Sequence, residues 1–155
     1  MPLPYTKLIH EKLSVILTFA FSAEPIESWL KKYFHGDFKF LYKTVNEIGS
    51  FNALSAFVEL AAFLRLLDDA DKLSSQNAGE IGITDFGRIV KKDRTVDRLN
   101  LRDMTNKIIH AKTWRWDVKN LEGPKLICVP NDPEGWAAAE VDISSLAAFC
   151  GTLAH

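Results

Sequence analysis

The strongest constraint on the fold is a long apolar segment that runs from Phe51 to about Leu73. Its side chains are apolar around much of a helical circumference, and before Asp68 only Glu59 and Arg65 interrupt them. Ser50, which directly precedes the segment, is a residue type that caps helix N-termini. A helix this apolar normally lies at the centre of a bundle. The segment therefore predicts a helical core against which the rest of the chain packs.

Two shorter helices are expected before this central one. Apolar residues recur at three- and four-residue steps from Pro4 to Phe21, which is helical periodicity. The sequence Ser22-Ala23-Glu24-Pro25 is typical of a helix boundary, and a second helix is expected from Glu24 to about Phe34. His35-Gly36-Asp37 is a stop signal. The stretch 38–48 fits both periodicities, and we favour a helix.

Two more helices are expected after a polar loop from Ser74 to Gly82. Thr84 or Asp85 can cap the first, which would end near Lys92. Thr95 can cap the second, which would run to about Ala111.

The last third of the chain changes character. Large apolar and polar residues alternate over Thr113–Val118, which favours a strand, and turn signals separate it from strands at Lys125–Val129 and Trp136–Val141. Asp142 or Ser144 can cap a final helix. Strands that follow one another through short turns predict an antiparallel meander.

These elements predict a mainly α protein of one domain, residues 1–155. We expect an up-and-down helical bundle over residues 1–112, a small C-terminal antiparallel β meander over 113–142 and a final helix over 143–155. Hydrophobic residues make up 47% and charged residues 25% of the chain, the balance of a globular protein. No apolar run approaches the roughly 18 residues needed to cross a bilayer, and the best candidate, Leu13–Phe21, is far too short. We therefore expect a cytoplasmic protein with no membrane partner.

The cysteines and the charge distribution limit the chemistry. Cys128 and Cys150 lack metal-ligand spacing and are expected to be buried, so neither a metal nor another cofactor is predicted. Positive charge is concentrated in residues 88–125, which hold 11 basic and 5 acidic side chains within a chain of net charge −1. Such a block can attract an anionic partner. It can equally be a solvated surface whose cations pair with acids elsewhere in the fold.

The predicted helix from Thr95 to Ala111 carries the one site-like pattern. Its apolar residues share one side, which is expected to face the bundle. On the opposite side, polar groups follow one another at four-residue steps and are neighbours on a helix surface: Arg98, Arg102, Asn106 and His110.

These side chains suit a phosphodiester. Arg102 offers a fork for phosphate oxygens, His110 can move a proton near neutral pH, and Asn106 can orient the ribose or a water molecule. Five nearby basic residues would bind the RNA backbone: Arg94, Arg98, Lys107, Lys112 and Arg115. The plainer interpretation is a solvated helix face without function. Glu59 would join the site if Arg102 or His110 paired with it, and otherwise lies on a polar edge of its helix.

The segment from Leu101 to Ala111 resembles the late-helix motif of the HEPN superfamily, in particular its HEPN-like branch among mobile integron gene cassettes. The superfamily's signature is an Arg, a following polar residue and a later His, and Arg102, Asp103 and His110 match it in type. The resemblance implies a helical bundle that dimerises and binds or cleaves RNA without a metal. It also implies that the Arg102 and His110 faces of two subunits form a shared cleft. Nothing in the sequence supports a toxin or antitoxin partner.

Two functions are therefore open. The first is a HEPN-like protein that binds or processes RNA, with possible endoribonuclease activity. The second is a non-catalytic module that binds a protein or a small ligand, which the seven-residue gap between Arg102 and His110 favours because it is one longer than the motif's usual range. An apolar pocket between helices would favour the second.

Overall fold

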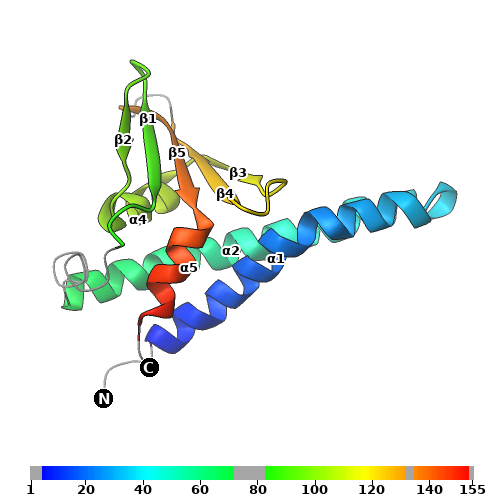
Figure 1. Cartoon of the computed structure of the whole chain (residues 1–155), viewed down its shortest axis with the longest axis horizontal. Helices are drawn as coiled ribbons and strands as arrows, with labels where there is room; N and C mark the ends of the chain where they lie inside the picture. Colours follow the sequence, from blue (N-terminus) through cyan, green and yellow to red (C-terminus); the bar gives the residue numbers. More distant parts are fainter. Residues whose placement is uncertain (1–4, 72–82, 132–134, 154–155) are drawn as a thin grey trace.

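The computed structural model describes residues 5–71, 83–131 and 135–153 (Figure 1). Two long helices, α1 (Tyr5–Tyr33) and α2 (Lys39–Asp71), are joined by a single 3-10 turn, η1 (Gly36–Phe38). They pack against each other as an antiparallel hairpin. Figure 1 shows that the tip of this hairpin extends well beyond the sheet, which stands over the other end of the helices. We call residues 14–52, which include the tip, the projecting hairpin.

Two predicted boundaries within these helices are wrong. α1 continues through Pro25, although a proline inside a helix removes one backbone hydrogen bond. Likewise Ser50 is not a cap, because α2 begins at Lys39 and the Ser50 hydroxyl donates to the carbonyl of Glu47 at 3.1 Å. The reason is long-range packing of α1 on α2, which outweighs local stop signals. The helix expected over 38–48 is confirmed as part of α2.

The helix predicted from Thr84 or Asp85 to Lys92 is wrong, and so is the first part of the helix predicted from Thr95 to Ala111. The chain instead forms β1 (Gly87–Lys91) and β2 (Val96–Arg98), an antiparallel hairpin. Its turn contains Arg94 at a φ of 69°, and the Asp93 carboxylate accepts the backbone N–H of Thr95 at 3.0 Å. Such an Asp-centred turn offers the backbone an alternative to helix. The loop predicted over 74–82 lies outside the described residues.

The next helix, α4 (Leu101–His110), begins later than predicted. Its N-cap is Asn100, whose side chain accepts the N–H of Asp103 at 2.8 Å, rather than Thr95. Arg98 therefore belongs to β2 and not to this helix. The helix connects β2 to β3 (Thr113–Asp117), which lie at opposite edges of the sheet.

The C-terminal prediction is confirmed. Strands β3, β4 (Lys125–Val129) and β5 (Trp136–Asp142) form the expected antiparallel meander. Asp142 caps the final helix α5 (Ile143–Gly151), since its carboxylate accepts the N–H of Ser144 at 3.1 Å. β1 adds to the free side of β5 and gives the order β2-β1-β5-β4-β3. The sheet is thus larger than the meander, and residues assigned to the bundle supply two of its strands.

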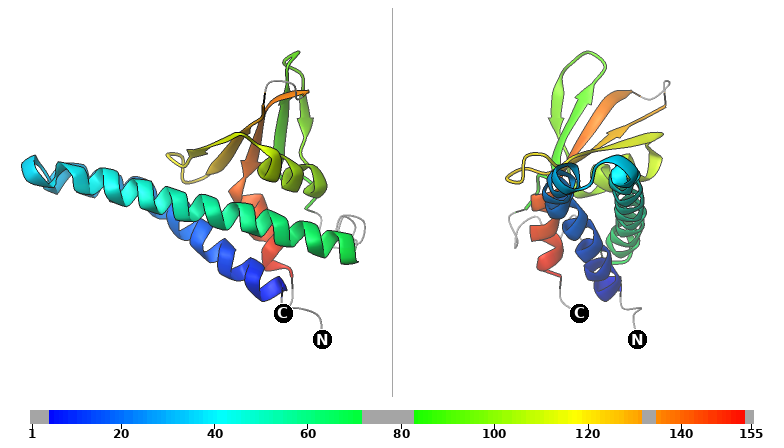
Figure 2. Two further views of the ribbon diagram at one scale, coloured as in Figure 1. Left: turned by 180° about the vertical axis from the view of Figure 1, so that it is seen from behind. Right: turned by 90° about the vertical axis from the view of Figure 1, so that its right-hand side faces the viewer.

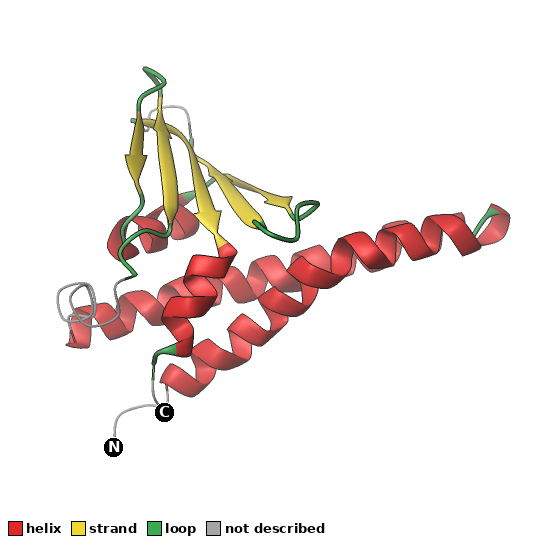
Figure 3. Ribbon diagram, viewed as in Figure 1, coloured by secondary structure: helices red, strands yellow, loops and turns green. Residues whose placement is uncertain are grey.

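One hydrophobic core joins the helices to the sheet (Figures 2 and 3). Ile9 and Ile16 of α1 and Phe57 and Leu64 of α2 belong to this core. Many buried side chains of the sheet and of α5 belong to it as well. The protein is therefore mainly α with a C-terminal β region and a final helix, although strands and helices alternate along the chain. Both cysteines are buried, as expected.

Part of α2 is also long and apolar enough to cross a membrane. The window lies within Phe40–Ala70 and has a mean hydropathy of 1.4, so the expectation that no segment is long enough was wrong. Only 33% of that window is buried inside the fold. Length and composition are weak evidence of a membrane span, because core helices of soluble proteins meet the same criterion.

Candidate functional site

Helix α4 lies as its amphipathic pattern predicts. Leu101, Met104 and Ile108 are buried, and the opposite side carries Arg102, Asn106 and His110. The N-cap at Asn100 and the buried stripe fix which way the polar side turns. That side does not face open solvent throughout, because part of it meets the C-terminal end of α2.

Arg102 is bound by two carboxylates of α2. Its guanidinium lies 3.2 Å from a carboxylate oxygen of Asp68 and 2.9 Å from one of Asp69. The Asp68 side chain is 3% exposed, whereas that of Arg102 is 47% exposed. The hydrogen bond from Arg102 lowers the pKa of Asp69, and the same bond raises the pKa of Arg102. The guanidinium proposed to hold a phosphate thus holds two side chains of its own chain.

Asn106 is bound to the same helix. Its side-chain oxygen accepts a hydrogen bond from Arg65, and Arg65 also lies 3.5 Å from Asp69. We call Arg65, Asp68, Asp69, Arg102 and Asn106 the α2–α4 polar cluster. Its two cations balance its two carboxylates, so the cluster carries no net charge.

His110 is separate from this cluster. It is the last residue of α4 and is exposed. Within the part of the chain that the structure describes, its ring has no hydrogen-bond or ion-pair partner. Eight residues of helix place it about 12 Å along the axis from Arg102. The structure therefore brings Arg102 and Asn106 together against α2 and leaves His110 apart from them.

The predicted RNA-binding residues are dispersed rather than clustered around His110. Arg94 lies in the β1–β2 turn and Arg98 on β2, while Arg115 is exposed on β3. Lys107 places its ammonium 4.6 Å from the ring centre of Trp136, and Lys112 is exposed after α4. Only Lys112 and Arg115 follow His110 closely in the chain.

Several cations of the basic block pair with acids of this chain. Arg88 pairs with Glu140 across two strands, and Lys91 lies 2.6 Å from Asp97. Arg98 lies 4.0 Å from Asp85. Together with Arg102, these pairs favour the interpretation of residues 88–125 as a solvated surface whose charge is partly compensated by acids of the same chain.

Glu59 and the two tryptophans of β3 make contacts within the fold. Glu59 pairs with Lys12 at 2.7 Å, not with Arg102 or His110. Trp114 donates its indole N–H to the carbonyl of Ile108, and the ring of Trp116 packs edge-on against Phe19. Among the residues that the structure describes, no group of acidic, His or Cys side chains could hold a metal ion. Burial raises the pKa of both cysteine thiols to about 12.

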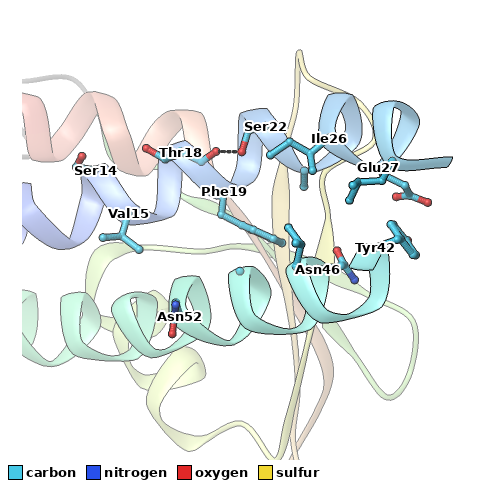
Figure 4. A pocket seen from close by; sticks show the side chains of 14 residues that line it. Ser14, Val15, Thr18, Phe19, Ser22, Ile26, Glu27, Tyr42, Asn46 and Asn52 are labelled. Atoms are coloured by element: carbon cyan, nitrogen blue, oxygen red, sulfur yellow. Dashed lines mark hydrogen bonds between the residues drawn. The ribbon is translucent and has the colours of Figure 1, made fainter. Parts of the chain in front are cut away.

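Sequence reasoning missed a groove between the two long helices. It has a volume of about 360 Å³ and lies along the projecting hairpin, with walls from both helices (Figure 4). Figure 4 shows Phe19 and Ile26 of α1 on one side and Asn46 and Asn52 of α2 on the other. All its lining residues belong to α1 and α2. A second hollow of about 550 Å³ lies between the hairpin and β3 and shares five lining residues with the groove: Phe19, Ala23, Glu27, Tyr42 and Asn46.

Two apolar stripes border this groove. On α1, the positions 15, 22, 26, 29 and 33 follow heptad-like spacing and all but Ser22 are exposed apolar or aromatic residues: Val15, Ile26, Trp29 and Tyr33. On α2, the steps of three and four residues continue through Leu41, Val45 and Ile48, which are 38%, 39% and 56% exposed. This spacing was visible in the sequence, but the predicted breaks at Ser22–Pro25 and Ser50 divided it.

Comparison with protein-family models, with curated proteins and with solved structures found no match for this chain. The resemblance to the HEPN superfamily therefore depends on residues 101–111 alone and stays a prediction.

Proposed function

We propose that this protein is a non-catalytic binding module that receives an amphipathic helix of a protein partner in the groove of the projecting hairpin. The observation that carries the proposal is the pair of exposed apolar stripes, one on α1 and one on α2, along a groove of about 360 Å³. Large exposed apolar patches mark interaction sites, because leaving them in water is unfavourable. Recognition of a helix in a groove uses this kind of surface, with anchors spaced by three and four residues.

The α2–α4 polar cluster supports a binding function over catalysis. A phosphate would have to displace Asp68 and Asp69 from Arg102, and the displaced Asp68 would lie buried next to a second negative charge. His110 can transfer a proton, but neither Arg102 nor Asn106, which are bound to α2, is available beside it to hold a phosphodiester. The polar groups that catalysis requires are therefore used in joining α4 to α2.

The residues that line the groove indicate the chemistry of the partner that it can bind. Val15, Ile26 and Val45 supply apolar contacts, while Ser22 and Asn52 can accept or donate a few hydrogen bonds. Glu27 lies at one wall, where a hydrogen bond from Lys31 lowers the pKa of its carboxyl. Such a lining suits a helix with an apolar stripe and occasional polar residues, rather than a charged ligand.

A synthetic amphipathic peptide tests this proposal. We expect a labelled helical peptide of about 18 residues (about 27 Å long), with Leu at three- and four-residue steps, to bind in a fluorescence anisotropy titration. A scrambled peptide of the same composition should bind at least about tenfold more weakly (about 1.4 kcal/mol). Val45→Asp should remove binding because it places a charge in the groove. Val96→Asp, the same change at an exposed valine of β2 outside the groove, is the matched control. Equal binding of both peptides would contradict the proposal.

One observation favours RNA binding as a second candidate. His110 is exposed and without a described partner, and the exposed cations Lys112 and Arg115 follow it. If this surface binds RNA, the affinity for a labelled single-stranded RNA should fall at least about tenfold between 50 and 200 mM salt, because the release of cations from the RNA on binding becomes less favourable as salt rises. Replacing Lys112 and Arg115 by Gln should flatten that salt dependence, and His110→Ala should remove any cleavage. Salt-independent or absent binding would exclude this candidate.

A further inference from the structure

We propose that the partner helix in the groove belongs to a second copy of this chain, so that two projecting hairpins pack face to face and antiparallel as a four-helix bundle. This inference rests on the proposed function of the groove and names its occupant. Its geometry differs from the cleft that the sequence resemblance implies, because it uses α1 and α2 and leaves Arg102 and His110 outside the interface.

The pattern of the stripes points to helices as the occupant. Both stripes follow the alternating steps of three and four residues with which packed antiparallel helices interlock. α1 and α2 already form half of such a bundle, and the groove face is the side that a second pair of helices would cover. Every residue that lines the groove comes from α1 or α2, so a second hairpin seated in it would contact these two helices.

The charges along the hairpin select a second copy and its direction. Lys31, Lys32 and Lys43 lie toward the tip, whereas three glutamates, Glu24, Glu27 and Glu47, lie nearer the body. Two hairpins with both tips at the same end would bring the lysines of both copies together. Within one chain Lys31 pairs with Glu27 and Lys43 with Glu47. In the antiparallel arrangement, a twofold axis near Val45 would also place Lys43 of each copy over Glu47 of the other. Opposite charges within about 8 Å attract each other at physiological ionic strength, so these charges favour the antiparallel arrangement.

The sizes of the side chains along α2 also fit the antiparallel arrangement. Suppose that a twofold axis passes near Val45 of α2. A residue that precedes Val45 in one copy then lies opposite the residue that follows Val45 by the same number of positions in the other copy. Large tip residues would then lie over small ones, Leu41 over Gly49 and Phe38 over Asn52, and the groove is lined by Gly49 and Asn52. Phe38 is 61% exposed in the single chain. Reversed packing would therefore fill the groove with exposed apolar side chains of the tip.

The available area fits a weak dimer. About 16 residues of each helix would overlap, a face about 24 Å long and about two helix diameters, or 20 Å, wide. A face of this size is about 480 Å² on each partner, less than the roughly 800 Å² that each contributes to a standard interface, so the dimer should dissociate on dilution. A lipid surface suits this face less well, since Glu24, Glu27 and Glu47 and the polar groove residues would have to enter the membrane with it.

The mass of the protein in solution tests the inference. Light scattering after size-exclusion chromatography should give about twice the 17.5 kDa of one chain. Val45→Asp should return the mass to that of one chain, because it would bring two carboxylates together at the axis. Val96→Asp, the same change at an exposed valine of β2, should remain dimeric. Val45 is 39% exposed, so its replacement leaves the fold intact, and an unchanged far-UV circular dichroism spectrum checks this.

A cysteine placed at the axis tests the orientation. Val45→Cys should form a disulfide-linked dimer on mild oxidation. A mixture of the Leu41→Cys and Gly49→Cys variants should form the mixed disulfide, and neither variant should cross-link with itself. The reason is that the antiparallel arrangement places residue 41 over residue 49, whereas a parallel one places each residue over its own copy. The native thiols do not interfere, since Cys128 and Cys150 are buried and their pKa values are raised to about 12. A dimer in which residue 45 does not cross-link would overturn the proposed arrangement.

The outcomes separate this inference from the proposed function. A mass of 17.5 kDa at all concentrations, with the amphipathic peptide still bound, would overturn the dimer and leave the groove as a site for another protein. A doubled mass without peptide binding would support the dimer alone. Sedimentation of a 17.5 kDa protein with vesicles of phosphatidylcholine and phosphatidylserine would overturn it in favour of a membrane surface.

Discussion

Replacing Gly87 by alanine is expected to cost the fold a large part of its stability. Gly87 opens β1 at a φ of 133°, a conformation that residues with a Cβ rarely adopt. A Cβ at this position would also overlap the backbone carbonyl oxygen of Glu140 on β5. The overlap is with backbone, so it can be relieved only by separating β1 from β5.

The expected loss is about 3 kcal/mol or more, the sum of backbone strain and overpacking. That is a large fraction of the roughly 5–15 kcal/mol by which domains are stable. Urea denaturation followed by circular dichroism should show a midpoint lower by about 1 M or more. Gly151→Ala is the control, because no atom lies near its Cβ position and its φ is ordinary. Equal midpoints for wild type and Gly87→Ala would mean that β1 does not pair with β5 at this register.

Gly87 also explains why the sequence misled us about this part of the fold. The stretch 84–92 has a capping residue and a short apolar run, which fit a helix locally. Its strand conformation depends on β5, about fifty residues later, and no local periodicity reveals such a partner. The useful signals were Gly87 and the turn formed by Asp93 and Arg94, which interrupt a helix but fit a hairpin.

The C-terminal meander was predictable because its strands pair with their neighbours in the chain. β4 was located to the residue, and β3 and β5 to within one. Turn residues separate each pair, so sequence order and spatial order agree. By contrast, α1 and α2 are longer than predicted because each supports the other across Pro25 and Ser50. Local breakers weaken an isolated helix but not one that a neighbouring helix holds in place.

For the candidate site too, local features could be predicted and contacts with distant elements could not. The buried and polar sides of α4 were predicted correctly, since they follow from periodicity alone. What Arg102 contacts could not be predicted, because Asp68 and Asp69 lie more than thirty residues earlier on another helix. A pattern on one helix shows which side chains share a face. It does not show which other element covers that face.

Replacing Arg102 by alanine is therefore expected to lower the stability of the free protein, whatever the protein binds. The change removes a charged partner from Asp68, whose side chain is 3% exposed. Leaving a buried charge with one partner fewer is costly. Because solvent screens the half-exposed guanidinium, we expect a measurable fall in the urea midpoint that is smaller than the fall for Gly87→Ala. Urea denaturation of the isolated chain measures it.

Two further variants and the pH dependence separate a structural role from a catalytic one. His110→Ala and Arg98→Ala should stay within about 0.5 kcal/mol of wild type, since both residues are exposed. Arg102 lowers the pKa of Asp69, so that carboxylate's contribution is present above the ordinary Asp pKa and is lost as the pH falls through its lowered value. The difference between wild type and Arg102→Ala should shrink accordingly in acid. If Arg102→Ala is as stable as wild type at neutral pH, Arg102 is free for a ligand, and the case for a phosphate site at α4 regains its main support.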